Sequence, residues 1–265
     1  MPTELLRRGL ADHRRALIGW CIGAAAYAAM LASIFPSIHG AADLDKLIQN
    51  YPEALKELLG VSAGITTGPG YLDVEFFNLI LPLLLLVMAI GSGARQIAGD
   101  EDAGRLELLL SYPLRRRDTV LSKGAVVGVE VAIVAAAVFL ALLILSPIAS
   151  LDLSVGKLAA GVAGVALIAL LHGWLALTVG AAGGGRGLAI GIPAALAAAG
   201  YLINGLHGLA GWLDPFRFLS SFWLVGTSPL ENGLNWWGVL VLVLGAAGVL
   251  GAGTRFFERR DLRVP

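Results

Sequence analysis

The stretch Gly99-Asp-Glu-Asp-Ala-Gly-Arg-Leu-Glu-Leu-Leu-Leu-Ser-Tyr-Pro-Leu-Arg-Arg-Arg117 lies between two long apolar runs and decides how the chain can be arranged. It carries too many charges to cross a membrane. Its residues Leu106, Leu109 and Leu110 fall on one side of a short helix, at i, i+3, i+4 spacing. Acidic residues precede this helix, arginines follow it and Pro113 ends it, as the helix dipole and the proline ring favour. The pattern predicts an amphipathic helix held between two membrane spans, which indicates a docking element for a partner protein.

The composition is typical of a protein that crosses the membrane several times. Hydrophobic residues make up 57% of the chain and charged residues only 14%, which excludes an ordinary soluble domain. The formal net charge is zero, so nothing indicates a nucleic-acid partner. Six apolar stretches are each long enough to cross a hydrocarbon core of about 30 Å. They predict membrane-spanning helices at Ile18–Phe35, Phe76–Ala98, Ala125–Pro147, Gly156–Ala181, Gly187–Asn204 and Leu234–Thr254.

The distribution of lysine and arginine predicts the orientation of these spans. With six spans, 15 of the 19 basic residues lie on one side of the membrane. They occupy the N-terminal segment, the links between spans two and three and between spans four and five, and the C-terminal segment. Basic residues concentrate on the cytoplasmic side. We therefore expect an all-α integral membrane protein, a single transmembrane domain over residues 1–265, with both termini in the cytoplasm.

Residues 3–15 predict an interfacial helix before the first span. Leu6, Leu10 and Leu17 recur on one face, and arginines occupy the other. Such a helix would lie in the headgroup layer with its basic face toward anionic lipid. A plain positively charged flank is the alternative interpretation.

Two longer segments, 39–75 and 207–235, are expected on the extracytoplasmic side. In the first, leucines at helical spacing interrupted by Pro52 predict two short amphipathic helices across the outer mouth. These helices would act as a gate or would only pack as a loop. The second segment is rich in tryptophan and phenylalanine, which favour the membrane–water interface. It either dips into the outer leaflet as a broken hairpin or anchors an ordinary loop.

Three polar residues in the predicted spans are candidates for a substrate path, because polar groups are costly inside a bilayer. Glu130 lies in the third span, nearer the inner surface than the middle, and a structural contact with another span is the alternative. His172 lies deep in the fourth span, where a lone histidine is more often hydrogen-bonded within the bundle. Asn204, near the outer end of the fifth span, is expected to be interfacial.

Catalytic and metal-binding motifs are missing from the sequence. The glycine-rich stretch at 181–187 lacks the Gly-Lys-Ser/Thr ending of a nucleotide-binding loop, and no His-Glu-x-x-His motif occurs. Ile90 stands where a rhomboid-type protease would need a glycine two residues before Ser92. The acids at 100–102 could bind a metal ion but are better explained as a helix N-terminus. We expect no catalytic residue, no metal site and no bound cofactor in this chain.

The inner loop resembles a known family segment. The residues that carry the resemblance are Glu101-Asp-Ala-Gly104, Leu106 to Pro113, Arg115-Arg116 and Lys123. They are similar to the hallmark of the permeases of ATP-binding-cassette (ABC) transporters of the type 2 exporter class. Residues 51–55 and 70–77 resemble one bacterial branch of that class. The resemblance covers most of the chain and is strongest over 99–123.

This resemblance implies a permease subunit in the bacterial cytoplasmic membrane that pairs with a second copy or a paralogue. Two separate ATPase subunits would bind to it and hold the ATP and Mg²⁺. Residues 99–117 would be the coupling helix, inserted into a groove of the ATPase, and residues 3–15 the elbow helix. Leucines would fill the groove, and charged residues would form ion pairs at its rim. The residues implicated in coupling are Glu101, Gly104, Leu106, Glu107, Leu109, Leu110, Pro113, Arg115 and Arg116.

Three functional hypotheses follow. The first is the permease of an ATP-driven exporter, and the apolar, nearly uncharged spans favour a lipophilic substrate such as an antibiotic, a lipid or a peptide. The second is a stand-alone secondary transporter or channel, which would need an internal repeat and charged residues at mid-membrane. The third is an intramembrane enzyme or structural protein. A co-purifying ATPase would discriminate between the first two.

Overall fold

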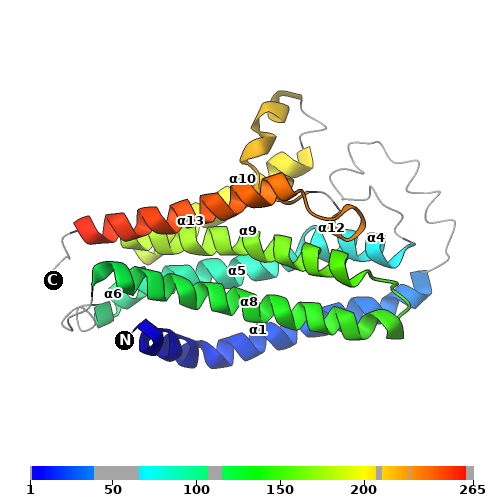
Figure 1. Ribbon diagram of the computed structural model, residues 1–265, viewed down its shortest axis with the longest axis horizontal. Helices are drawn as coiled ribbons and strands as arrows, with labels where there is room; N and C mark the ends of the chain where they lie inside the picture. Colours follow the sequence, from blue (N-terminus) through cyan, green and yellow to red (C-terminus); the bar gives the residue numbers. More distant parts are fainter. Residues whose placement is uncertain (1, 39–65, 107–114, 207–210, 227, 261–265) are drawn as a thin grey trace.

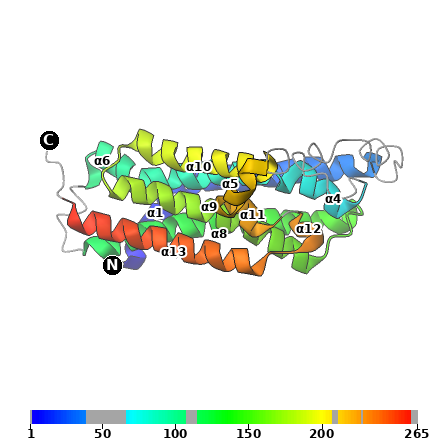
Figure 2. The same ribbon diagram turned by 90° about the horizontal axis from the view of Figure 1, so that it is seen from above.

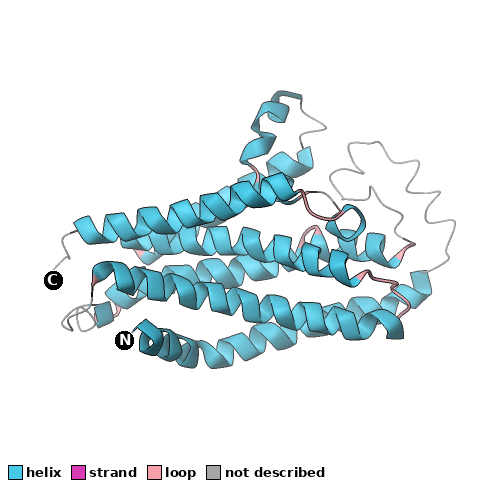
Figure 3. Ribbon diagram, viewed as in Figure 1, coloured by secondary structure: helices cyan, strands magenta, loops and turns pink. Residues whose placement is uncertain are grey.

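The computed structural model describes residues 2–38, 66–106, 115–206, 211–226 and 228–260. Within these ranges the chain is helical, with no strand (Figure 3). Six helices there are long and apolar enough to cross a membrane. Five of them are single α-helices, namely α1 (Pro2–Ile38), α8 (Arg116–Ile148), α9 (Val155–Ala181), α10 (Arg186–Leu206) and α13 (Trp236–Arg259). The all-α fold with six candidate spans expected from the sequence is confirmed.

The second span is a composite helix. It consists of α4 (Gly68–Leu72), the π-helix η1 (Asp73–Phe77), α5 (Ile80–Ala94), the π-helix η2 (Arg95–Gly99) and α6 (Asp100–Asp102). The Thr67 hydroxyl caps the first turn by accepting a hydrogen bond from the backbone N–H of Gly70 (3.2 Å). The helix therefore begins well before the predicted start at Phe76. The predicted start marks the beginning of the apolar run, whereas the helix itself begins after a polar cap that precedes this run.

Residues 3–15 are helical as expected, but they form the first part of α1, which continues without a break to Ile38. Arg7, Arg8 and other arginines on this part are exposed. Leu10 and Leu17 pack toward the core of the bundle. The amphipathic pattern is therefore real, while its location in the headgroup layer stays a prediction.

The central helix of the bundle is α9 (Figures 1 and 2). It packs against α5, α8, α10 and α13, whereas α1 lies at the edge of the bundle against α8. Leu158, Val165, Ile168 and Leu177 of α9 are buried. About half of α9, 14 of its 27 residues, is buried.

Helices α5 and α9 approach each other closely at two glycines. A Cβ atom on Gly93 would lie 2.0 Å from the carbonyl oxygen of Gly173, and one on Gly173 would lie 2.9 Å from that of Ala89. Small residues of this kind allow the backbones of membrane helices to come together. The crossing fixes α5, and with it the segment that follows, on the central helix.

The chain starts and ends at the same end of the bundle, where α1 begins and α13 ends (Figure 1). We call this the basic end, because most of the described lysine and arginine residues lie there. Both termini are thus on one side, as the sequence predicts. That this side is the cytoplasm stays a prediction.

The segment expected over 207–235 forms three short helices where it is described: η3 (Gly211–Leu219), α11 (Ser221–Val225) and α12 (Pro229–Asn232). Figure 1 shows η3 projecting sideways from the bundle, and its residues Trp212 and Phe218 are exposed. Asp73 Oδ1 accepts a hydrogen bond from the backbone N–H of Leu230 (3.3 Å), which holds α12 against the second span. Insertion of this segment into the outer leaflet stays a prediction, and residues 39–65 of the other outer segment lie outside the described ranges.

Candidate functional site

The structure describes the two ends of the 99–117 segment. The helix of the second span ends at Asp102, and Gly104, two residues later, has a φ of +67°, which glycine adopts readily. Residues 105 and 106 are helical again, and α8 begins at Arg116 directly after Arg115. Outside the described residues lie Glu107, Leu109, Leu110 and Pro113, so the amphipathic helix predicted from the leucine spacing stays a prediction.

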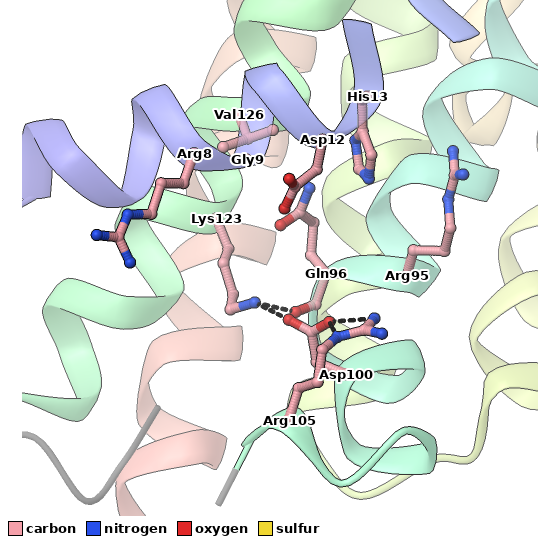
Figure 4. A pocket seen from close by; sticks show the side chains of 10 residues that line it. All are labelled: Arg8, Gly9, Asp12, His13, Arg95, Gln96, Asp100, Arg105, Lys123 and Val126. Carbon is pink, nitrogen blue, oxygen red and sulfur yellow. Dashed lines mark hydrogen bonds and ion pairs between the residues drawn. The ribbon is translucent and has the colours of Figure 1, made fainter. Parts of the chain in front are cut away.

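The acidic residues at 100–102 end a helix, and the interpretation that they begin one is wrong. Gly99 is itself helical (φ −69°, ψ −31°), so α6 continues the second span. Carboxylates at a helix C-terminus are unfavourable, because the helix dipole is negative there. Two cations compensate: Lys123 Nζ lies 2.5 Å from Asp100 Oδ2, and Arg105 Nη2 lies 2.7 Å from Asp100 Oδ1 (Figure 4).

A second set of contacts ties the segment to the last helix. The Arg260 guanidinium, just after α13, donates to Glu101 Oε1 and to the carbonyl oxygen of Gly180 (3.4 Å). Arg116 Nη1 donates to the carbonyl oxygens of Phe257 (3.3 Å) and Arg260. Together Asp100, Glu101, Arg116, Lys123 and Arg260 form what we call the charged clasp. The clasp joins both ends of the segment to α8, α9 and α13.

The sequence alone predicts only some residues of the charged clasp. Glu101 and Arg116 belong to the predicted coupling segment, but Arg260 is separated from Glu101 by 159 residues. Its one signal in the sequence is its position directly after the last apolar run, which indicates only a positively charged flank.

Leu106 is buried in the bundle itself, with 1% of its surface exposed. It packs in a cluster with Ile97, Val120, Leu177 and Phe257. This differs from the expectation that Leu106 fills a groove on a partner. Leu106 anchors the segment to the bundle. A groove contact made by Leu109 and Leu110 stays a prediction, since both lie outside the described residues.

Glu130 is buried in α8 and joins three helices. Its Oε1 lies 2.5 Å from Nδ1 of His13 on α1, and its Oε2 accepts a hydrogen bond from the Ser92 hydroxyl on α5. This is the structural contact with other spans that the sequence leaves open as the alternative to a substrate path. His13 gives no signal in the sequence, since 117 residues separate it from Glu130.

His172 and Asn204 lie elsewhere in the bundle. His172, buried in α9, donates from Nδ1 to the Ile168 carbonyl oxygen (2.8 Å), a hydrogen bond within its own helix. Asn204 is partly buried in the last turn of α10, away from the basic end. Among the residues that the structure describes, no group of three or more His, Cys, Asp or Glu side chains is placed to hold a metal ion.

An apolar groove of about 470 Å³ lies between α5 and α10. Leu83, Val87 and Ile90 line it from α5, and Ala194 and Ala198 line it from α10. Leu83 and Val87 are about half exposed, so the groove opens on the surface of the bundle. Its lining suits an apolar molecule rather than an ion.

The six helices long and apolar enough to span a membrane, with an apolar groove on the side of the bundle, define an integral membrane protein. A family comparison identifies the class more closely. The family model for the C-terminal domain of the multidrug efflux system permease Rv1217c matches residues 9–258, nearly the whole chain. The chain therefore belongs to this family and is a multi-pass permease. No curated protein matches it.

Proposed function

We propose that the chain is the membrane permease subunit of an ATP-driven ABC exporter in a bacterial cytoplasmic membrane. It would pair with a second permease copy or a paralogue and bind two ATPase subunits. Membership in a multidrug efflux permease family supports transport out of the cell. The resemblance of residues 99–123 to the ABC hallmark supports ATP as the energy source. The chain itself would hydrolyse nothing, because ATP and Mg²⁺ would be held by its partners.

The charged clasp is the observation that carries this proposal. It ties the start of the segment to α8 through Asp100 and Lys123, and to α13 through Glu101 and Arg260. A displacement of the segment by a partner would therefore be transmitted to the second span, α8 and α13, whereas a loose loop would absorb it. Packed elements joined in this way move as bodies, which is what alternating access requires.

Charge reversal at the proposed coupling residues tests the assignment. We expect Arg115→Glu and Glu107→Arg to leave folding intact but to lower transport per ATP hydrolysed by about tenfold, because like charges at an interface cost several kcal/mol. Arg117→Glu is the matched control, since Arg117 is exposed, adjacent and outside the proposed coupling set. The measurement is ATPase activity and substrate transport of the reconstituted complex. Wild-type transport by both coupling variants would refute the coupling-helix assignment.

The apolar groove between α5 and α10 supports a lipophilic substrate such as an antibiotic, a lipid or a peptide. A phenylalanine at Ala198 would fill the groove, whereas one at Ala195, which is also exposed but does not line it, would not. We expect Ala198→Phe to reduce efflux of a lipophilic dye from cells about tenfold, and Ala195→Phe to leave it unchanged. Equal efflux by the two variants would place the substrate elsewhere.

A stand-alone secondary transporter is the second candidate function. Glu130, buried in α8 with the partly buried His13 against it, favours it, because intramembrane carboxylates are typical of proton relays. A gentle-detergent pull-down of the tagged chain from native membranes, followed by mass spectrometry, discriminates between the two. A stoichiometric ATPase would support the exporter, and a chain reproducibly free of ATPase would support the secondary transporter.

A further inference from the structure

A polar cavity of about 380 Å³ lies at the basic end, between the first turns of α1 and the region where η2 faces α8 (Figure 4). We call it the basal cavity. Arg8 lies at its rim with 77% of its side chain exposed, so the cavity is open to solvent at the basic end. Figure 4 shows the side chains of Asp12 and His13 pointing from α1 into it.

His13 separates the basal cavity from Glu130. His13 belongs to the lining of the cavity, whereas Glu130 does not. The side chain of His13 is 19% exposed and that of Glu130 only 3%, and the two meet at 2.5 Å between Nδ1 and Oε1. A proton that enters the cavity therefore reaches the pair at the imidazole of His13.

The hydrogen bonds of Glu130 decide which nitrogen of His13 can take up that proton. An ionised carboxylate only accepts hydrogen bonds. In the neutral imidazole, Nδ1 therefore carries the hydrogen and donates it to Oε1 of Glu130, while the Ser92 hydroxyl donates to Oε2. No hydrogen bond joins Nε2 of His13 to another residue in the described parts of the chain. The lone pair of Nε2 is thus the place where a proton from the cavity binds.

Glu130 favours the protonated form of His13. Among the residues that the structure describes, His13 is the only ion-pair partner of Glu130. The negative charge of Glu130 is therefore compensated only when His13 is an imidazolium. An uncompensated charge is costly inside a helix bundle, so the pair gains from binding a proton.

The other charges that face His13 across the basal cavity oppose this effect only weakly. They belong to Arg8, Asp12, Arg95, Asp100, Arg105 and Lys123. Asp100 engages both Lys123 and Arg105, at 2.5 and 2.7 Å, and Arg8 lies 3.5 Å from Glu4. Arg95 and Asp12 have opposite charges. Because Coulomb energy falls with distance, the Glu130 carboxylate in direct contact with the ring outweighs these partly compensated groups.

The polar path from the basic end stops at Glu130. Toward the other end of α8, the buried face continues with Val131, Val134 and Val138. These valines belong to the same apolar core cluster as Met88 and Ala89 of α5. The apolar core therefore separates the pair from the opposite end of the bundle, whereas the basal cavity joins it to the solution at the basic end.

We propose that His13 and Glu130 form a proton-binding site that fills from the basic end through the basal cavity and holds α1 on α8 when it is occupied. The proton binds to Nε2, and the neutral imidazole becomes an imidazolium that faces the carboxylate. The contact between the two helices is then a hydrogen bond between opposite charges, which is stronger than one from a neutral donor. Helix α1 is thus held more firmly as the pH at the basic end falls. The inference depends on the fold and not on the energy source, since no proton needs to cross the membrane.

Nitrogen NMR of the full-length chain in lipid nanodiscs, with any subunits that accompany it and with labelled histidine, tests the proton site. The signal of His13 is identified by its loss in His13→Gln. We expect a neutral ring with hydrogen on Nδ1 at high pH and an imidazolium at low pH. In Glu130→Gln, protonation should need a proton concentration at least about tenfold higher, because the adjacent opposite charge is gone. Equal titration of His13 in the two proteins would overturn the proposal.

His172 is the internal control. It is buried in α9, and its Nδ1 donates to the Ile168 carbonyl oxygen of its own helix rather than to a carboxylate. We expect Glu130→Gln to leave its signal unchanged, and water in the wild-type sample to exchange protons with the ring of His13 but not with that of His172. A ring of His13 that does not exchange with water would refute entry through the basal cavity. A similar change at both histidines would mean a general rearrangement of the bundle and would contradict a local site.

The hold on α1 is tested by thermal unfolding at about pH 5.5 and pH 7.5, on either side of the usual histidine range. If the folded chain binds this proton more tightly than the unfolded chain, stability is gained at low pH and lost as the pH rises. We expect the wild-type midpoint to rise at the lower pH relative to that of His13→Gln, which cannot take up the proton. His172→Gln is expected to keep the wild-type pH dependence. A parallel pH dependence of the wild-type chain and His13→Gln would rule out the proposed hold on α1.

Discussion

A Gly93→Ala variant is expected to lose most of its folded population at temperatures where the wild-type chain is stable. The added methyl carbon would lie 2.0 Å from the Gly173 carbonyl oxygen, which belongs to the backbone of the central helix. No side-chain rotation relieves that contact, so α5 and α9 must separate. Overpacking costs roughly 1–3 kcal/mol where side chains can adjust, and we expect at least the upper end of that range here. Thermal unfolding in detergent, followed by size-exclusion chromatography, measures the effect.

Gly91→Ala is the control for this prediction. Gly91 lies two residues earlier on α5, and a Cβ atom there would meet nothing within 4 Å. Its midpoint temperature is expected to match that of the wild-type chain, because substitutions away from tight contacts usually change stability by less than about 0.5 kcal/mol. Equal stability of Gly91→Ala and Gly93→Ala would show that α5 and α9 do not cross as closely as described.

The second large effect is expected from His13→Leu. The variant leaves the Glu130 carboxylate, 2% exposed, with Ser92 as its remaining described partner. Removing the partner of a buried polar group leaves that group unsatisfied in a poorly solvating environment, which typically costs about 1–3 kcal/mol. We expect a marked fall in the thermal midpoint of the purified protein, measured by intrinsic tryptophan fluorescence.

The double variant His13→Leu/Glu130→Leu provides the decisive comparison. Replacing both members of a buried pair by apolar residues is often neutral or stabilising, so the double variant is expected to be more stable than His13→Leu alone. If the two substitutions add instead, the contact between α1 and α8 at this position contributes little to stability.

The six spans were predictable because the signal for each is local. A run of apolar residues long enough to cross a bilayer identifies a span without knowledge of its neighbours. The ends of the spans were less predictable, since they depend on caps and turns. The three acidic residues at 100–102 do not show, by their composition alone, whether a helix begins or ends there. Only the backbone at Gly99 and Gly104 shows that they end one.

The candidate site was predictable in part for the same reason. Local charge and leucine spacing identify the 99–117 segment in the sequence. Glu130 is identified by its location in an apolar run. Their partners are remote in the chain: His13 lies 117 residues from Glu130, and Arg260 lies 159 residues from Glu101. No local pattern encodes such pairs. The burial of Leu106 could not be predicted for a related reason. A leucine that packs into the bundle and one that packs on a partner occupy the same position in the sequence pattern.

The uninterrupted length of α8 has a mechanical consequence. Its 33 residues form a rod of about 50 Å, whereas the hydrocarbon core is about 30 Å thick. Arg116 lies at one tip, beside the segment that we propose to bind the ATPase, and Ile148 lies at the other. Glu130, near the midpoint, is fastened to α1 and α5. A push at Arg116 is therefore expected to swing the far tip in the opposite direction, with Glu130 as the fulcrum, so that one rigid lever would carry motion from one membrane face to the other.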